Sequence, residues 1–153
     1  FVQKQVSETD RNGKLAAPVA PLANWATGLG NSLTRPAMQA ATGIDRNAAL
    51  PKFHGKTFAA RAKAAPPVRD EAAPAAGRKA VLYATCFVNY NSPSIGEAAQ
   101  AVLARNGVET QVVYPRCCGM PKLELGDLES VEKFKNTAIS KALPKMPGRW
   151  RRR

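Results

Sequence analysis

The sequence predicts an α/β protein built around one parallel βαβ unit, which follows a mostly extended, partly helical amino-terminal arm. Two short apolar runs, residues 80–84 and 108–114, have the length of strands, and a helix-length segment separates them. All three cysteines lie shortly after these two runs. Seven of the twelve prolines fall before residue 77, which favours a loosely organised first half and a compact second half.

The first 58 residues are expected to form an extended arm with short helices. Residues 1–20 show no sustained period and contain a polar run, so we expect them to be exposed. Over residues 21–33, large apolar residues at helical spacing predict a short amphipathic helix in which Trp25 is a packing residue. These apolar residues are Leu22, Trp25, Leu29 and Leu33.

A second short helix is predicted over residues 35–42. Thr34 is a candidate N-cap, and Pro36 suits the first turn of a helix because its missing N–H would have no partner there. Gly43 suits the carboxyl end, where a left-handed residue commonly stops a helix.

Two segments without a core pattern follow. Residues 49–58 are expected to form an extended connector that contains His54, the one histidine of the chain. Because the neighbours of His54 are basic rather than acidic, we expect a surface or packing residue there and not a metal ligand. Residues 59–78 are rich in Ala and Pro and predict a linker, the clearest domain boundary in the chain.

The predicted βαβ unit has recognisable boundaries. Residues 80–84 are continuously apolar, which is typical of a strand buried on both faces. Ser94 and Glu97 have the spacing of a capping box at the start of the helix. Asn106 and Gly107 have the character of its carboxyl-terminal stop.

One more helix is predicted after the second strand, with Asp127 as its N-cap. Its apolar stripe consists of Leu128, Val131, Phe134, Ala138 and Ala142. Residues 144–153 form a basic tail, of which residues 147–153 show no core pattern and are expected to be disordered.

The βαβ topology predicts that the cysteines meet. Cys86 follows the first strand, and the adjacent pair Cys117 and Cys118 follows the second. Since the carboxyl ends of parallel strands lie at the same edge of a sheet, the three thiols are expected at one edge. Thiolates there would suit an iron-sulfur cluster or a zinc ion. The alternative from the residues alone is that all three are buried small apolar side chains. Thiol redox catalysis has less support, because the chain has no Cys-x-x-Cys motif.

The charge and the cysteine count limit the possible settings. The net charge of +12 is spread over both halves of the chain, apart from the arginines near its end, so a dedicated nucleic-acid surface is not indicated. No apolar stretch approaches the roughly 20 residues that span a bilayer. An odd number of cysteines with an adjacent pair does not match a secreted disulfide framework and favours a reducing cytoplasm.

Two motifs carry a resemblance to a known family. The segments ATCFVNYN and YPRCCGMP, with 30 residues between Cys86 and Cys117, resemble the CCG-domain cysteine-rich module of iron-sulfur proteins. That module occurs in the B subunit of heterodisulfide reductase and in the C subunit of anaerobic glycerol-3-phosphate dehydrogenase, and the resemblance is closer to the latter type. It extends from about Ala49 to Phe134.

The resemblance implies a function for the thiols. Cys86, Cys117 and Cys118 would be ligands of an iron-sulfur cluster of the 4Fe-4S type, with Gly119 permitting the turn after the pair and Pro121 stiffening the loop. The chain would be an electron-transfer subunit of an oxidoreductase rather than a catalytic subunit by itself. Its partners would be a flavin dehydrogenase or other redox subunits, in the cytoplasm or, through those partners, at the inner face of the cell membrane.

The resemblance also implies that this chain carries half of a module, over residues 79–143. The family pattern continues with a Cys-x-x-Cys motif and usually a second copy, and neither occurs in this sequence. We therefore expect the ligand set to be incomplete within one chain. The alternative function is a basic scaffold or interaction subunit without a cluster, whose extended first half and arginine tail bind a larger complex or nucleic acid.

Overall fold

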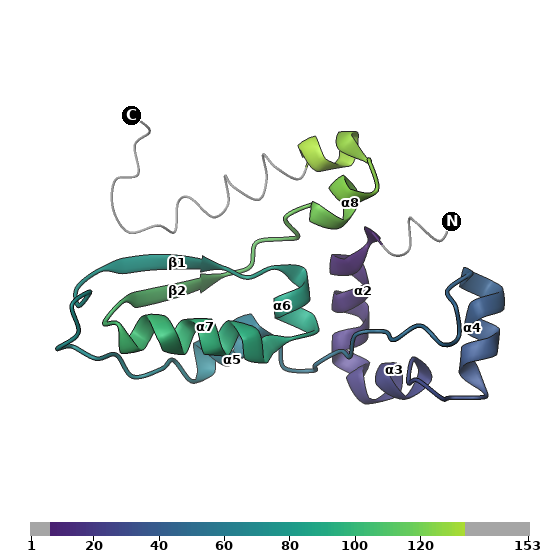
Figure 1. The fold of residues 1–153 in the computed structure, drawn as a ribbon, viewed down its shortest axis with the longest axis horizontal. Helices are drawn as coiled ribbons and strands as arrows, with labels where there is room; N and C mark the ends of the chain where they lie inside the picture. Colours follow the sequence, from purple (N-terminus) through teal and green to yellow (C-terminus); the bar gives the residue numbers. More distant parts are fainter. Residues whose placement is uncertain (1–6, 134–153) are drawn as a thin grey trace.

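The computed structural model describes residues 7–133. Helices dominate the first half, and a small parallel sheet forms the centre of the second half (Figure 1). In chain order the elements are α2 (Thr9–Ala16), the 3₁₀ helix η1 (Ala17–Val19), α3 (Ala20–Ala26), α4 (Thr34–Thr42), α5 (Phe58–Ala64), β1 (Lys79–Tyr83), α6 (Cys86–Tyr90), α7 (Pro93–Arg105), β2 (Glu109–Val113) and α8 (Met120–Glu124).

The βαβ prediction is confirmed. Strands β1 and β2 pair in parallel, with Lys79 opposite Glu109 at one end and Tyr83 opposite Val113 at the other. Helices α6 and α7 make the crossover between them. The expectation that the first strand is buried on both faces is wrong, because β1 is only half-buried beyond its exposed first residue. The described sheet has two strands, so each strand has a neighbour on one side only.

Helix α7 differs from its prediction at the start and agrees at the end. It begins at Pro93, the preceding residue Ser92 is its N-cap, and no side chain caps it, so the predicted capping box does not form. The Glu97 carboxylate instead lies 3.4 Å from the guanidinium of Arg61 in α5. At the carboxyl end, Gly107 adopts the left-handed conformation with φ of 84°, as the sequence predicts.

Helix α5 lies inside the segment that the sequence indicates as a linker. Thr57 caps it, accepting a hydrogen bond from the backbone N–H of Ala60. Phe58, which is 0% exposed, packs so closely against Gly96 of α7 that an added Cβ there would lie 2.7 Å from its ring. The linker prediction is wrong for residues 59–64, which belong to a helix anchored by the buried side chains of Phe58 and Ala62. The boundaries proposed for the domains stay a prediction.

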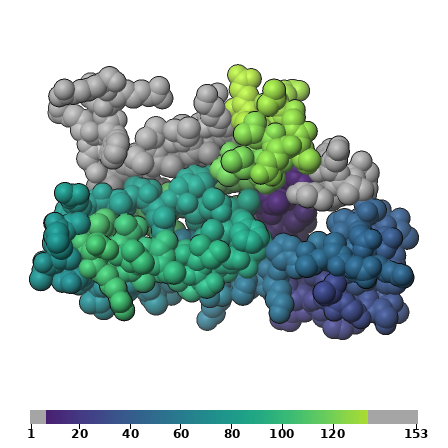
Figure 2. Space-filling view, in the orientation of Figure 1, coloured from purple at the N-terminus to yellow at the C-terminus, as the bar shows by residue number. Residues whose placement is uncertain are grey.

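Residues 7–20 are largely helical and packed, where the sequence predicts an exposed arm over residues 1–20; residues 1–6 lie outside the described residues. Helix α2 lies beside α6, and the space-filling view shows it between the βαβ half and the segments around α4 (Figures 1 and 2). Gly13 of α2 is buried, and an added Cβ would lie 2.3 Å from Cδ2 of Tyr90 in α6. Ala17 of η1 is buried in the same cluster as Tyr90. The prediction fails because Gly and Asn in α2 weaken its helical pattern.

The helix predicted over residues 21–33 stops early, and its apolar stripe is not buried. Helix α3 ends at Ala26, and Gly30 has a φ of 87°. Trp25 is 56% exposed, so the packing role predicted for it is wrong. Its stripe partners Leu22, Leu29 and Leu33 are exposed as well.

Helix α4 confirms the second predicted helix with one change at its start. Thr34 is already helical, and its hydroxyl donates to the Ala26 carbonyl. The Asn31 side chain accepts hydrogen bonds from the backbone N–H groups of Leu33 and Thr34. Gly43 caps the carboxyl end in the left-handed conformation, as predicted.

The chain after α8 is described only in part. Residues 128–133 are helical, and Asp127 precedes them, accepting a hydrogen bond from the Ser130 N–H, so its predicted cap is confirmed. The rest of the predicted stripe, from Phe134 onward, and the basic tail lie outside the described residues. Within residues 7–133, no helix combines the length and the apolar character needed to cross a membrane.

The contact between α2 and α6 makes a testable prediction. Gly13→Ala should lower the free energy of unfolding by about 1–3 kcal/mol, because the added methyl group overpacks the contact with Tyr90. At an exposed helix position a Gly→Ala substitution would instead raise the free energy of unfolding by up to about 1 kcal/mol. Urea denaturation measures the difference, with Arg11→Ala on the exposed part of α2 as the control. A stabilised Gly13→Ala protein would contradict the packing of α2 on α6.

Candidate cysteine site

The first cysteine is placed by a capped helix that follows β1 directly. Thr85 has extended backbone angles, and its hydroxyl accepts a hydrogen bond from the Val88 N–H, so α6 begins at Cys86. The sharp change from strand to helix therefore leaves Cys86 at the carboxyl end of β1. Its side chain is 5% exposed.

The adjacent cysteines are placed by the loop that follows β2. The Tyr83 hydroxyl, at the end of β1, donates to the carbonyl of Arg116 and ties this loop to the neighbouring strand. Gly119 then adopts a φ of 90°, which a residue with a side chain rarely does, and Pro121 lies in the first turn of α8. The predicted turn role of Gly119 is confirmed. Its N–H donates to the sulfur of Cys117 at 3.4 Å.

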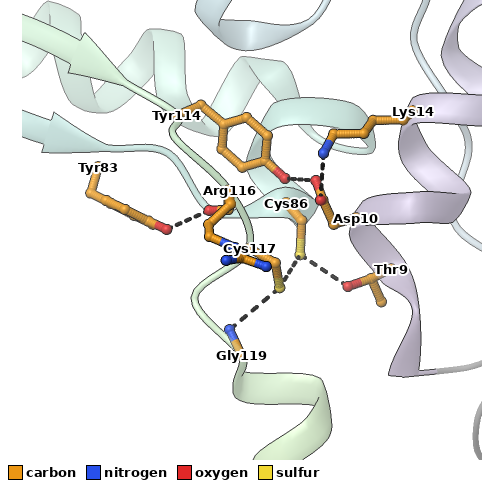
Figure 3. Close-up of polar contacts among 9 residues, drawn as sticks. All are labelled: Thr9, Asp10, Lys14, Tyr83, Cys86, Tyr114, Arg116, Cys117 and Gly119. Atoms are coloured by element: carbon orange, nitrogen blue, oxygen red, sulfur yellow. Dashed lines mark hydrogen bonds and ion pairs between the residues drawn. The ribbon is translucent and has the colours of Figure 1, made fainter. Parts of the chain in front are cut away.

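Two of the three predicted thiols meet (Figure 3). The Sγ atoms of Cys86 and Cys117 lie 3.7 Å apart, and both residues are buried. Cys118 is exposed. Within residues 7–133, no group of three or more His, Cys, Asp or Glu side chains is close enough to hold a metal ion. The structure thus brings Cys86 and Cys117 together and leaves Cys118 on the outside.

The close pair changes the acidity of both thiols. A hydrogen bond from Cys117 lowers the pKa of the Cys86 thiol to about 6, and a hydrogen bond with Thr9 acts in the same direction. The same sulfur–sulfur contact raises the pKa of Cys117 well above its ordinary value, and burial adds to the rise. The sulfur–sulfur contact therefore acts in opposite directions on the two groups: it favours the thiolate form of Cys86 and the thiol form of Cys117. Burial, followed by the charges of the cysteines, raises the pKa of nearby Tyr83 to about 12.

Residues of α2 complete the surroundings of the pair, and the sequence analysis missed them. The Thr9 hydroxyl lies 3.1 Å from the sulfur of Cys86. Next to it, Asp10 accepts a hydrogen bond from the hydroxyl of Tyr114, the residue directly after β2, and forms an ion pair with Lys14 at 2.7 Å (Figure 3). Burial, followed by the bond to Asp10, raises the pKa of Tyr114.

A local signal for α2 does exist in the sequence. Asp10 and Lys14 are four residues apart, with the acidic residue first, which is the favourable order for an ion pair on a helix. That signal predicts a helix and says nothing about what the helix contacts. His54 is half-buried, and its Nδ1 lies 3.4 Å from a guanidinium nitrogen of Arg61.

The donor atoms are of the type that a soft metal prefers, but too few of them lie together to complete its coordination. Thiolate sulfur is the preferred ligand of iron-sulfur clusters and of zinc, and N–H donors such as that of Gly119 commonly face ligand sulfurs. Two buried thiols do not complete four-fold coordination. Further ligands would have to come from Cys118 after a change in its loop, or from groups outside residues 7–133.

Comparisons with known proteins identify the cysteine region. Residues 80–145 match the model of the CCG family, described as a cysteine-rich domain. The chain is similar to the C subunit of anaerobic glycerol-3-phosphate dehydrogenase of Escherichia coli K12, with 34% identity over 131 residues, and equally to that of Escherichia coli O157:H7.

These alignments cover 84% of this chain and 31% of each relative, so the chain spans about a third of the length of the curated relatives that it matches. No solved structure gives a significant match. The motifs around Cys86 and the Cys117–Cys118 pair, the parallel βαβ unit and both comparisons agree: residues 80–145 match the cysteine-rich CCG domain, and the chain resembles the C subunit of anaerobic glycerol-3-phosphate dehydrogenase.

Proposed function

We propose that this chain is an iron-sulfur electron-transfer component of a dehydrogenase complex, with Cys86, Cys117 and Cys118 among the ligands of a 4Fe-4S type cluster. The observation that carries the proposal is the Cys86–Cys117 pair, whose sulfur atoms lie 3.7 Å apart at the carboxyl ends of two parallel strands. The matches to a cysteine-rich domain and to a dehydrogenase subunit support it.

The surroundings of the pair suit a group that transfers electrons. The bound cluster would supply one-electron chemistry, and the protein would supply ligands and a partly apolar shell. That shell consists of Ala17 and Tyr90, which are buried with both cysteines, and of Tyr114, whose ring meets that of Tyr90 edge to face at 5.6 Å. Excluding water from one side of the thiols lowers the local dielectric constant, on which a reduction potential depends.

The partners and the setting follow from the same proposal. A flavin dehydrogenase or another redox subunit would exchange electrons with the cluster, and the chain would not be a catalytic subunit by itself. Its place would be the cytoplasm, including the inner face of the membrane if a partner is bound there. The competing function is a basic scaffold without a cluster, for which the net charge of +12 is the supporting observation.

Iron and acid-labile sulfide content, measured on the full chain purified without oxygen, tests the proposal. After reconstitution with iron and sulfide we expect both elements, together with the broad visible absorption of a thiolate-bound cluster, at less than full occupancy because the ligand set of one chain is incomplete. The matched control is the Cys86→Ala variant, which removes one buried ligand and should be colourless. A folded wild-type protein that lacks iron even after reconstitution with iron and sulfide would contradict the proposal and leave the scaffold function.

A further inference from the structure

We propose that Thr9 of α2 is a positioning residue for the cysteine site, donating a hydrogen bond to the sulfur of Cys86 when that sulfur binds a metal. The inference rests on the proposed function and adds a residue that lies outside the matched domain, residues 80–145. The two atoms are 3.1 Å apart. Either of them can donate while Cys86 is a thiol, but a thiolate has no proton, so the hydroxyl must then be the donor.

The position of Thr9, the first residue of α2, is determined by contacts of the residues before and after it, Glu8 and Asp10. Asp10 accepts a hydrogen bond from the Tyr114 hydroxyl, just after β2. Glu8 forms an ion pair with Lys122 of α8 at 2.8 Å, in surroundings that are partly buried. Both contacts join α2 to the segment that carries Cys117, while Thr9 itself contacts Cys86. Three consecutive residues at the start of α2 therefore bridge the two chain segments that supply the thiol pair.

Apolar packing, in addition to these polar contacts, holds α2 in place. The backbone of α2 at Gly13 lies directly against the Tyr90 ring, and Ala17 is buried in one cluster with Cys86 and Cys117. Thr9 is thus presented to the sulfur from a helix that packs against the site. A hydrogen bond from such a partner orients a ligand sulfur and stabilises its negative charge, and loss of such a partner typically costs about 10–100-fold in metal affinity.

The experiment titrates the metal-free, reduced chain of residues 1–153 with Cd²⁺ and follows the ultraviolet charge-transfer absorption of thiolate–cadmium bonds. Wild type is compared with Thr9→Val, which keeps the shape and removes the hydroxyl, and with Thr9→Ser, which keeps the hydroxyl. Thr9→Ala is a second variant without the hydroxyl. The matched control is Thr42→Val, whose hydroxyl donates to the Met38 carbonyl within its own helix. Circular dichroism and the thermal midpoint check folding.

We expect Thr9→Val and Thr9→Ala to bind Cd²⁺ about tenfold more weakly than wild type, with Thr9→Ser and Thr42→Val within about twofold. In iron-loaded protein, loss of the donor should also lower the reduction potential, because the hydrogen bond favours the more negative, reduced state. Equal Cd²⁺ affinity in wild type and in a folded Thr9→Val or Thr9→Ala protein would overturn the inference. The Cd²⁺ comparison needs no iron, so it gives its answer even if the iron analysis contradicts the proposed function.

Discussion

Cys117→Ser is expected to abolish the iron bound by the full chain and to remove its visible absorption. Cys117 is one of the two buried thiols, and its sulfur lies 3.7 Å from that of Cys86. A serine hydroxyl is a hard donor that stays protonated at neutral pH and binds iron in a cluster poorly in place of thiolate. Iron and sulfide analysis of the purified variant, with an absorption spectrum, measures the effect.

Two further variants are needed to interpret this result, one as a control and one to test the third cysteine. Ser94→Ala changes an exposed residue of α7 and should keep the wild-type iron content. Cys118→Ser tests the exposed thiol: loss of iron would mean that Cys118 turns toward the pair when a cluster is bound. Unchanged iron in Cys117→Ser would remove Cys117 from the ligand set and, with it, the main support for a cluster at this edge of the sheet.

Phe58→Ala is expected to lower the free energy of unfolding by about 3–5 kcal/mol, the usual cost of removing a fully buried phenylalanine. Phe58 is 0% exposed and forms a core cluster with Ala62 and Ala84. The facing residue in α7 is Gly96, which has no side chain to fill the space. Urea denaturation of the metal-free protein, followed by circular dichroism, gives the change in the transition midpoint.

The control for this substitution is Val68→Ala in the segment after α5. Val68 is 91% exposed, so its truncation should change the free energy of unfolding by less than about 0.5 kcal/mol. A Phe58→Ala protein as stable as the Val68→Ala protein would mean that α5 does not pack on the βαβ unit. Residues 59–64 would then be the linker that the sequence predicts.

Local pattern predicts the strands and the long helix of the βαβ unit and, outside it, helix α4 and the helix after Asp127. The apolar runs identify β1 and β2, and a helical period with a Gly stop identifies α7. The meeting of Cys86 and Cys117 follows from these elements, because parallel strands bring their carboxyl ends to one edge. The starts of α7 and α4 are harder to predict, since several neighbouring polar residues can cap a helix and the choice depends on small differences in backbone angle.

Local pattern does not predict two helices outside the two strands and their crossover, α5 and α2, because both depend on contacts with distant residues. Helix α5 is short and Ala-rich, and it is held by Phe58, whose partner Gly96 lies 38 positions further along the chain. Helix α2 has a polar and irregular sequence, since one of its packing positions is a glycine. A glycine contributes nothing to an apolar period, yet its missing side chain is what admits the Tyr90 ring.

The amino-acid sequence by itself therefore determined the α/β class, the parallel pair of strands and the edge at which the thiols lie. Only the tertiary structure decided that α2 joins the site, that Thr9 contacts Cys86, and that Cys118 remains exposed while its neighbour is buried. The reason is physical. The periodicity of a sequence shows which face of a helix or strand is apolar. The contact between Thr9 and Cys86, 77 positions apart, depends on how separate elements pack, and local residue spacing does not encode this packing.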